Sequence, residues 1–231
     1  FDGFEHNLIV TSVSPWLKER AEKSPILERK DHRVVLNGLD TNVFHVYETS
    51  ELKKKLGLKD EKIIFHATPF FDLNPHHIKG GYYVAEIARR LEQSNVKIIV
   101  AGSYSKEISL PKNMIMLGRI TDQKLLAKYY SMADVTLLTS QRETFSMITA
   151  ESLCCGTPVV GFKAGGPENI AINEYSYFLD FGDVDLLKKA ILETIENNYD
   201  SENISSVACR IYAKLVMCEN FIDIYKELYR R

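Results

Sequence analysis

From residue 62 onward, short β-branched or apolar runs alternate with longer amphipathic stretches. The apolar runs, which we expect to be strands, cover residues 62–67, 96–101, 114–117, 134–138, 158–161 and 176–179. Between them, residues 81–93 and 123–132 carry apolar side chains at the spacing of one helix face, the latter with Leu125, Leu126 and Tyr129 directed inward. Because this alternation is typical of parallel strands joined by crossover helices, the sequence predicts an α/β fold with about six parallel strands and helices on both faces.

The flanking segments predict a small unit before the main sheet and a helical tail after it. Residues 8–13 and 34–36 are strand-like, and Pro15 after Ser14 starts a predicted helix over residues 15–23. A charged helix is expected over residues 48–56, and apolar residues at helical spacing predict helices over residues 183–197 and 205–230. We therefore place a boundary near Val46, with residues 1–46 as the end of a preceding domain and residues 47–231 as the main domain.

Composition excludes several classes of protein. The 29 basic and 31 acidic residues give a formal charge of −2, so no global field attracts nucleic acid. No apolar run is long enough to span a bilayer, which predicts no integral membrane segment. The four cysteines lack metal-binding spacing and are interpreted as reduced thiols of a cytoplasmic protein. Residues 1–6 lack the order of a signal peptide and an initiator methionine, so we expect a chain cut from a longer one.

The stretch from residue 140 to 160 carries the clearest chemical signal. Glu143 and Glu151 stand eight positions apart across a predicted junction of strand, loop and helix. If the helix starts near Phe145, the two carboxylates lie about 10 Å apart, at 1.5 Å per residue. The amides of Phe145, Ser146 and Met147 would then present a positive helix end to a diphosphate. Glu143 would accept hydrogen bonds from sugar hydroxyls, and Glu151 from a ribose diol.

At this point the sequence resembles the retaining glycosyltransferases of family 4, also called glycosyltransferase group 1. The resemblance covers nearly the whole chain and rests on the order and spacing of several short motifs. They are Ser14-Pro15-Trp16-Leu17, Asn37-Gly38-Leu39-Asp40 with Phe44, Lys79-Gly80, Gly118-Arg119-Ile120, Ala133-Asp134, the pair Glu143 and Glu151, Cys155-Gly156-Thr157-Pro158-Val159-Val160, and Gly165-Gly166 with Glu168. The resemblance implies the C-terminal, donor-binding half of a GT-B enzyme, which is built from two Rossmann-like domains.

The resemblance also implies a role for each matching residue. The first glutamate, Glu143, would contact the donor sugar, and the second, Glu151, the ribose. Lys79 would bind the phosphates, so that Glu143 and Lys79 are the expected catalytic residues. The segment Gly118-Arg119-Ile120 would lie beside the base, and the turn Asn37-Gly38 near the cleft between the two domains.

For the reaction, the resemblance implies transfer of a sugar, of the hexosyltransferase type, from a nucleotide-diphosphate sugar with retained configuration. No metal and no other cofactor is implied. The acceptor would be a glycan or a lipid-linked molecule bound through the N-terminal domain, and the role surface polysaccharide biosynthesis. A cytoplasmic location is implied, and peripheral association of the full-length protein with a membrane stays open. Without the acceptor half, the chain would transfer sugar poorly or not at all.

Two departures from the family pattern affect the expected site. Many members have an arginine soon after the first strand of the donor domain, where this chain has the sequence Phe65-His66-Ala67-Thr68-Pro69-Phe70. Lys79 would then act without that partner, helped by the Thr68 hydroxyl. The family also commonly has glycine at the position of Ser146, and a side chain there restricts the approach of a donor to the backbone.

Two other classes of protein and three short motifs allow other interpretations. A noncatalytic module that binds nucleotide sugars would keep the same residues. A dinucleotide-dependent oxidoreductase is disfavoured because no G-x-G-x-x-G follows the first main strand. Asp183-Val184-Asp185 resembles a metal-binding DxD but is better explained as a helix cap. His76-His77 is interpreted as part of a surface loop, and Trp16 as packing at a helix start.

Overall fold

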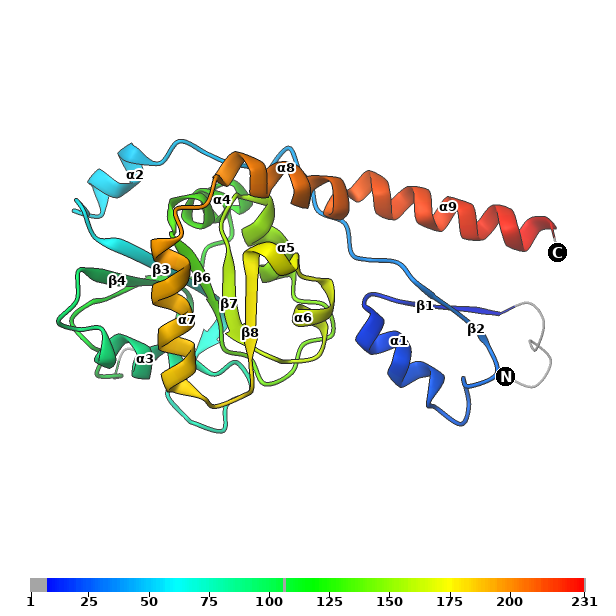
Figure 1. The fold of residues 1–231 in the computed structure, drawn as a ribbon, viewed down its shortest axis with the longest axis horizontal. Helices are drawn as coiled ribbons and strands as arrows, with labels where there is room; N and C mark the ends of the chain where they lie inside the picture. The colour runs from blue at the N-terminus through cyan, green and yellow to red at the C-terminus, as the bar shows by residue number, and fades with distance from the viewer. Residues whose placement is uncertain (1–7, 106, 231) are drawn as a thin grey trace.

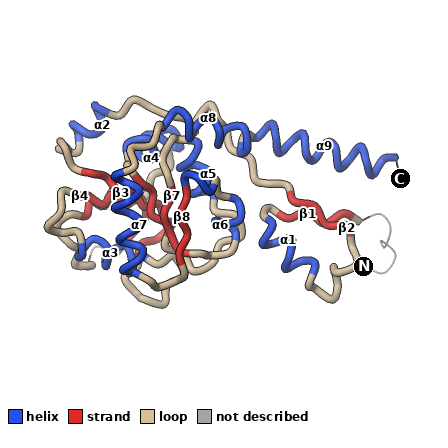
Figure 2. Tube along the Cα trace, viewed as in Figure 1, coloured by secondary structure: helices blue, strands red, loops and turns tan. Residues whose placement is uncertain are grey.

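The main unit is a six-stranded parallel sheet, as the sequence predicts. The computed structural model describes residues 8–105 and 107–230. The sheet has the strand order β5-β4-β3-β6-β7-β8, and Figures 1 and 2 show it enclosed by helices. Its strands are β3 (Lys62–Phe71), β4 (Val96–Tyr104), β5 (Met114–Gly118), β6 (Val135–Leu138), β7 (Val159–Phe162) and β8 (Ser176–Leu179). All neighbouring pairs in this sheet are parallel.

Helices cover both faces of the sheet and bury a separate core on each. On one face α3 (Gly81–Arg90) and α7 (Val184–Glu196) pack against the strands through residues such as Val84, Ile87, Leu187 and Ile191. On the other face lie α4 (Gln123–Met132), α5 (Met147–Cys154) and α8 (Ser201–Tyr212). The short helices α2 (Ser50–Lys55), α6 (Gly166–Ile170) and η1 (Asn173–Tyr175) lie in the connections.

The strand order locates the place where ligands can bind. The chain moves outward from β3 to β5 in one direction, then returns to β6 and moves outward to β8 in the other. The loops that follow β3 and β6 therefore leave the sheet in opposite directions and open a crevice between them. In open α/β sheets, ligands bind at the carboxyl ends of the strands, at this switch point.

Several element boundaries differ from those predicted, for local reasons. Strand β3 continues to Phe71 past a register shift between Ala67 and Phe70, and a bulge of this kind tolerates Pro69 inside a strand. Helix α5 begins at Met147, later than the start near Phe145 that the sequence suggested. The inward assignment of Leu125 was wrong, because 36% of this residue is exposed.

The segment before the main sheet forms a small unit of its own. Strands β1 (Ile9–Ser12) and β2 (Asp31–Val34) pair in parallel and are connected by α1 (Pro15–Glu22). The Ser14 side chain accepts a hydrogen bond from the Leu17 amide and caps α1, and its hydroxyl donates to the Thr144 carbonyl at 2.6 Å. The small unit therefore touches the loop that precedes α5.

The C-terminal tail is two helices, whereas the sequence suggested one over residues 205–230. Helix α8 ends at Tyr212 and α9 (Lys214–Arg230) follows after a break at Ala213, which has an extended backbone. The Leu39 amide donates to the Tyr212 carbonyl at 2.7 Å, and the Lys214 amide donates to the Leu39 carbonyl at 2.8 Å. This pairing occupies the Tyr212 carbonyl and the Lys214 amide, which in a continuous helix would form hydrogen bonds within the helix.

Helix α9 extends away from the main sheet and runs past the small unit (Figure 1). Arg33 of β2 forms an ion pair with Glu227 of α9 at 3.2 Å.

Over residues 8–105 and 107–230, no helix combines the length and the hydropathy needed to cross a membrane. The expectation for residues 1–6 concerns a segment outside the described residues.

Candidate functional site

A cavity of about 520 Å³ opens at the carboxyl edge of the sheet, between the ends of β3 and β4 and the helices α4 and α5. It brings together most of the residues that the sequence analysis selected. Of these, Lys79, Glu143, Glu151, Ser146, Met147, Arg119, Ile120 and Thr68 line it. The other lining residues are Ala67, Pro69, Ala101, Gly102, Leu126, Tyr130 and Ile148.

Lys79 is held at the cavity by the loop that leads into α3. The Thr139 hydroxyl donates to the Lys79 carbonyl at 3.1 Å, and the Gln141 amide donates to the Ile78 carbonyl at 2.8 Å. Gly80 has a φ of +66°, and a Cβ there would lie 2.1 Å from the Thr139 carbonyl oxygen. Only glycine fits this close crossing, so Gly80 fixes the direction in which Lys79 leaves the loop.

Glu143 is anchored by its backbone to the loop after β7. Its amide donates to the Ala164 carbonyl at 2.9 Å, and its carbonyl accepts from the Gly166 amide at 2.8 Å. The Glu168 carboxylate in turn accepts from the amides of Ala164 and Gly165 and holds this loop in shape. The backbone of Glu143 is thus held by residues 164–168, a segment that is distant in sequence.

The carboxylate of Glu143 and the ammonium of Lys79 form an ion pair at 2.6 Å across the cavity wall. The two side chains are 17% and 28% exposed, respectively, so water screens the pair only in part. Both groups were expected to contact a ligand, and here each satisfies the other. A ligand phosphate that binds Lys79 therefore comes close to the Glu143 carboxylate, and the two negative charges repel each other.

The start of α5 presents backbone amides to the cavity. Ser146 is the N-cap with φ 78°, a left-handed conformation that is uncommon for residues other than glycine. Its hydroxyl oxygen accepts from the Thr149 amide at 3.3 Å. Met147 and Ile148 are the first two residues of α5, whose amides have no acceptor within the helix, and both residues line the cavity. This helix end is therefore suited to an anion.

Glu151 lies further along α5 and has a partner that the sequence analysis missed. The Tyr130 hydroxyl of α4 donates to Oε2 of Glu151 at 2.9 Å. Burial raises the pKa of Glu151, and the hydrogen bond from Tyr130 opposes this shift. No motif marks Tyr130, since an inward tyrosine at helical spacing is usually a core residue.

Two further basic residues, Arg119 and His66, lie near Lys79. Burial lowers the pKa of His66 to about 4, and its Nδ1 lies 2.9 Å from the Leu137 carbonyl oxygen as a donor. His66 is therefore neutral near pH 7 and does not replace the arginine that many family members have nearby. Arg119 lines the same cavity as Lys79 and is exposed.

Four of the selected residues do not line the cavity. The Phe145 ring is 3% exposed and belongs to the core beneath α5. Gly118 ends β5 with φ +75°, one residue before Arg119. Asn37 and Gly38 lie beside α9, where the Gly38 amide donates to the sulfur of Met217 at 3.3 Å. A donor-binding role for these four residues stays a prediction.

Asp183 and Asp185 of the DxD-like motif, and Trp16, have structural roles. Asp183 is the N-cap of α7, and its carboxylate accepts from the Leu186 amide at 3.0 Å. Asp185 forms an ion pair with Arg90. The described residues contain no group of three or more His, Cys, Asp or Glu side chains placed to hold a metal ion. The Trp16 ring packs on Gly165 at the start of α6, and Arg20 stacks over it at 4.1 Å.

Fold and site together define a class of protein. An open parallel sheet of this strand order, with a helix end, a lysine and two acids at its carboxyl edge, is a Rossmann-like domain suited to a ligand that carries phosphates and hydroxyls. Residues 48–213 match the family described as "Glycosyl transferases group 1". The chain therefore belongs to this family, which confirms the resemblance found in the sequence.

Curated relatives agree with the family assignment. The chain is 24% identical over 235 residues to N-acetyl-alpha-D-glucosaminyl L-malate synthase of Bacillus anthracis, covering 98% of this chain and 60% of that protein. It is 27% identical over 214 residues to D-inositol 3-phosphate glycosyltransferase of Mycobacterium marinum, covering 86% of this chain and 44% of that protein. The chain thus spans about half of the length of these relatives.

Solved structures show the same fold at low sequence identity. Sucrose-phosphate synthase from Thermosynechococcus elongatus matches with a TM-score of 0.78 and 20% identity, covering 96% of this chain and 58% of that one. Anabaena HepE in complex with UDP matches with a TM-score of 0.77 and 20% identity, covering 95% and 64%. The fold of the chain is that of a Rossmann-like domain of the GT-B architecture.

Proposed function

We propose that this chain binds the nucleotide-diphosphate sugar of a glycosyltransferase that transfers the sugar to a glycan or other acceptor with retained configuration. The observation that carries the proposal is the meeting of Lys79, Glu143 and Glu151 in one cavity, with the start of α5 between the two acids. The cavity volume of about 520 Å³ is within the usual range for small-molecule sites. HepE, a structural neighbour, has been solved with UDP and with UDP-glucose.

Each part of the donor has a matching group in this arrangement. The ammonium of Lys79 and the amides of Met147 and Ile148 bind the diphosphate. Glu143 accepts hydrogen bonds from the hydroxyls of the sugar, and Glu151 accepts them from the ribose diol. Arg119 and Ile120 line the end of the cavity beside β5, where the base is placed in this proposal.

The same groups explain how transfer is accelerated. When the bond between sugar and phosphate breaks, negative charge grows on the diphosphate and positive charge on the sugar carbon. Lys79 and the helix amides stabilise the departing diphosphate, while the carboxylate of Glu143 lies beside the sugar. The acceptor enters from the N-terminal domain, and we assign the product to surface polysaccharide biosynthesis by analogy with the family.

Transfer by the full-length protein tests this proposal. We expect Glu143→Ala to abolish sugar transfer and to retain UDP binding. The sugar hydroxyls lose the carboxylate that accepts their hydrogen bonds, whereas the diphosphate on Lys79 no longer faces a negative side chain. Nuclear magnetic resonance of the product reports whether the anomeric configuration is retained. Transfer that persists in Glu143→Ala would contradict the assignment of Glu143. Absence of transfer by the wild-type protein, with UDP still bound, would favour the noncatalytic binding module.

A further inference from the structure

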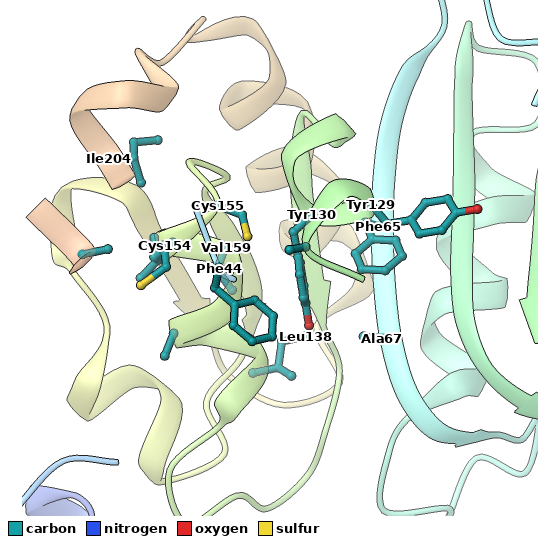
Figure 3. Packing of buried hydrophobic residues seen from close by; sticks show 14 of the residues in the cluster. Phe44, Phe65, Ala67, Tyr129, Tyr130, Leu138, Cys154, Cys155, Val159 and Ile204 are labelled. Atoms are coloured by element: carbon teal, nitrogen blue, oxygen red, sulfur yellow. The ribbon is translucent and has the colours of Figure 1, made fainter. Parts of the chain in front are cut away.

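The Tyr130 side chain belongs both to the core and to the cavity. Its ring is completely buried and packs edge-on against Phe65, with 5.0 Å between the ring centroids. Figure 3 shows Tyr130 next to Phe65 in this core cluster. The Tyr130 carbonyl also accepts from the Thr157 hydroxyl at 2.7 Å. The ring and the backbone are therefore fixed before any ligand arrives.

The one polar atom of this side chain reaches Glu151. The hydroxyl donates to Oε2 of Glu151 at 2.9 Å, and both residues line the cavity. A glutamate side chain that is free to rotate loses conformational entropy when a ligand fixes it. Here Tyr130 has already selected the orientation of Glu151, which leaves Oε1 and the second lone pair of Oε2 as acceptors.

The hydroxyl also influences the charge of the carboxylate. Burial raises the pKa of Glu151, and the hydrogen bond from Tyr130 lowers it. Among the described residues, the other titratable groups facing this region are Cys154 on the same helix, Cys155 directly after it, Cys209 of α8 beside Cys154, and Lys79, Glu143 and Arg119 around the cavity. Without the Tyr130 hydroxyl, protonation of Glu151 moves to higher pH, and a protonated carboxyl loses acceptor capacity.

We propose that Tyr130 is a positioning residue for donor recognition, whose hydroxyl holds Glu151 in the orientation that accepts both hydroxyls of the nucleotide ribose. This inference rests on the proposed function, because it takes Glu151 as the ribose-binding residue. Tyr130 itself does not touch the reacting atoms. Its contribution is the orientation and the ionised state of Glu151.

The 2′-hydroxyl of the nucleotide provides a direct readout. The full-length protein is titrated with UDP, GDP and ADP and with their 2′-deoxy counterparts by calorimetry, and the base that binds most tightly is used further. In Tyr130→Phe we expect the affinity for the ribonucleotide to fall about tenfold, equal to about 1.4 kcal/mol, and the affinity for the deoxynucleotide to fall much less. The pH below which the affinity for the ribonucleotide is lost should also be higher in Tyr130→Phe than in the wild-type protein.

Tyr129→Phe is the matched control. Tyr129 is the neighbouring residue on α4, stacks on the same Phe65 at 6.0 Å and does not line the cavity. We expect it to leave the preference for the ribonucleotide unchanged. Thermal unfolding is measured for both variants. If Tyr130→Phe does not fold, incorporation of 3-fluorotyrosine at position 130 keeps the ring and strengthens the donor, and the preference for the ribonucleotide should then rise.

Glu151→Gln separates the two levels of the proposal. If Glu151→Gln reduces the preference for the ribonucleotide but Tyr130→Phe behaves like Tyr129→Phe, the positioning role is refuted and the proposed function stands. An equal loss of both nucleotides in Tyr130→Phe, with no change in the pH profile, also refutes it, because that is the effect of a purely structural residue. If Glu151→Gln leaves the preference unchanged, or the wild-type protein binds none of the nucleotides, the proposed function itself fails.

Discussion

The ion pair between Lys79 and Glu143 predicts that removing one negative charge strengthens the binding of a sugar-free nucleotide. In Glu143→Gln the side chain keeps its size, but the ammonium of Lys79 no longer faces a carboxylate at 2.6 Å. A nucleoside diphosphate then binds Lys79 without repulsion from a neighbouring carboxylate. At the same time, the donor sugar loses a charged acceptor, so binding of the nucleotide and transfer of the sugar should change in opposite directions.

The exposure of the pair sets the size of the effect. Exposed ion pairs contribute about 0 to 1 kcal/mol, and removing one partner of a fully buried pair costs about 3–5 kcal/mol. With 28% and 17% of the side chains exposed, this pair lies between the two cases. The glutamine carbonyl still accepts a hydrogen bond from Lys79, which limits the gain. We therefore expect about 1 kcal/mol, a decrease of about fivefold in the Kd for UDP.

Calorimetric titration of UDP into the wild-type protein and Glu143→Gln measures this change. The gain should shrink as the salt concentration rises, because ions screen a pair that is partly exposed. Asp180→Asn is the matched control, since Asp180 pairs with Lys163 at 2.8 Å and neither residue lines the cavity. A Kd for UDP that is unchanged or higher in Glu143→Gln would refute the reasoning.

Three further predictions concern the surroundings of the site. Ser146→Gly should raise the free energy of unfolding, measured in urea, by about 0.5 kcal/mol, because relief of the strain at the positive φ exceeds the loss of the hydrogen bond from the Thr149 amide. Ser146→Ala keeps the strain and loses that hydrogen bond, so it should lower the free energy of unfolding by about 1 kcal/mol. Gly165→Ala should lower the free energy of unfolding by more than about 1 kcal/mol, because a Cβ there would meet the Trp16 ring at 2.4 Å. It should also weaken UDP binding, because Gly165 pairs with the backbone of Glu143. Gly182→Ala is its control, with a similar φ of +92° but 3.7 Å of clearance, and equal UDP binding in both alanine variants would contradict the prediction. Incubation with EDTA should leave the transfer rate of the full-length protein unchanged, and a loss that Mg²⁺ restores would show that a metal takes part.

Features with a strong local pattern could be predicted from the sequence. The strands β3, β4 and β6 were recognisable because their apolar runs are largely buried on both faces of the parallel sheet. The helix over residues 123–132 was predicted with the bounds that α4 has, because Leu126 and Tyr129 recur at helical spacing and pack on the core. Glu143, Glu151 and Lys79 were selected by spacing and resemblance, and the cavity brings these side chains together.

Features that depend on contacts between distant segments could not be predicted. The break between α8 and α9 is set by the backbone of Leu39, far away in the sequence. The hydrogen bond from Tyr130 to Glu151 joins two helices and has no counterpart in any local pattern. The ion pair of Lys79 with Glu143 was missed for a different reason, because each residue was considered only for its contact with a ligand.

The two faces of the sheet differ in their relation to the cavity: the cavity is lined from the side of α4 and α5, and the opposite face is covered by α3 and α7. The core beneath α3 and α7 contains Val84, Ile87, Leu187 and Ile191. Among the residues that the structure describes, it shares none with the lining of the cavity. Substitutions there change how firmly the domain is folded without altering the surface that a ligand meets. Evolution can therefore adjust thermal tolerance on one side while specificity diverges on the other, and a protein engineer can improve the yield of this domain by repacking that side alone.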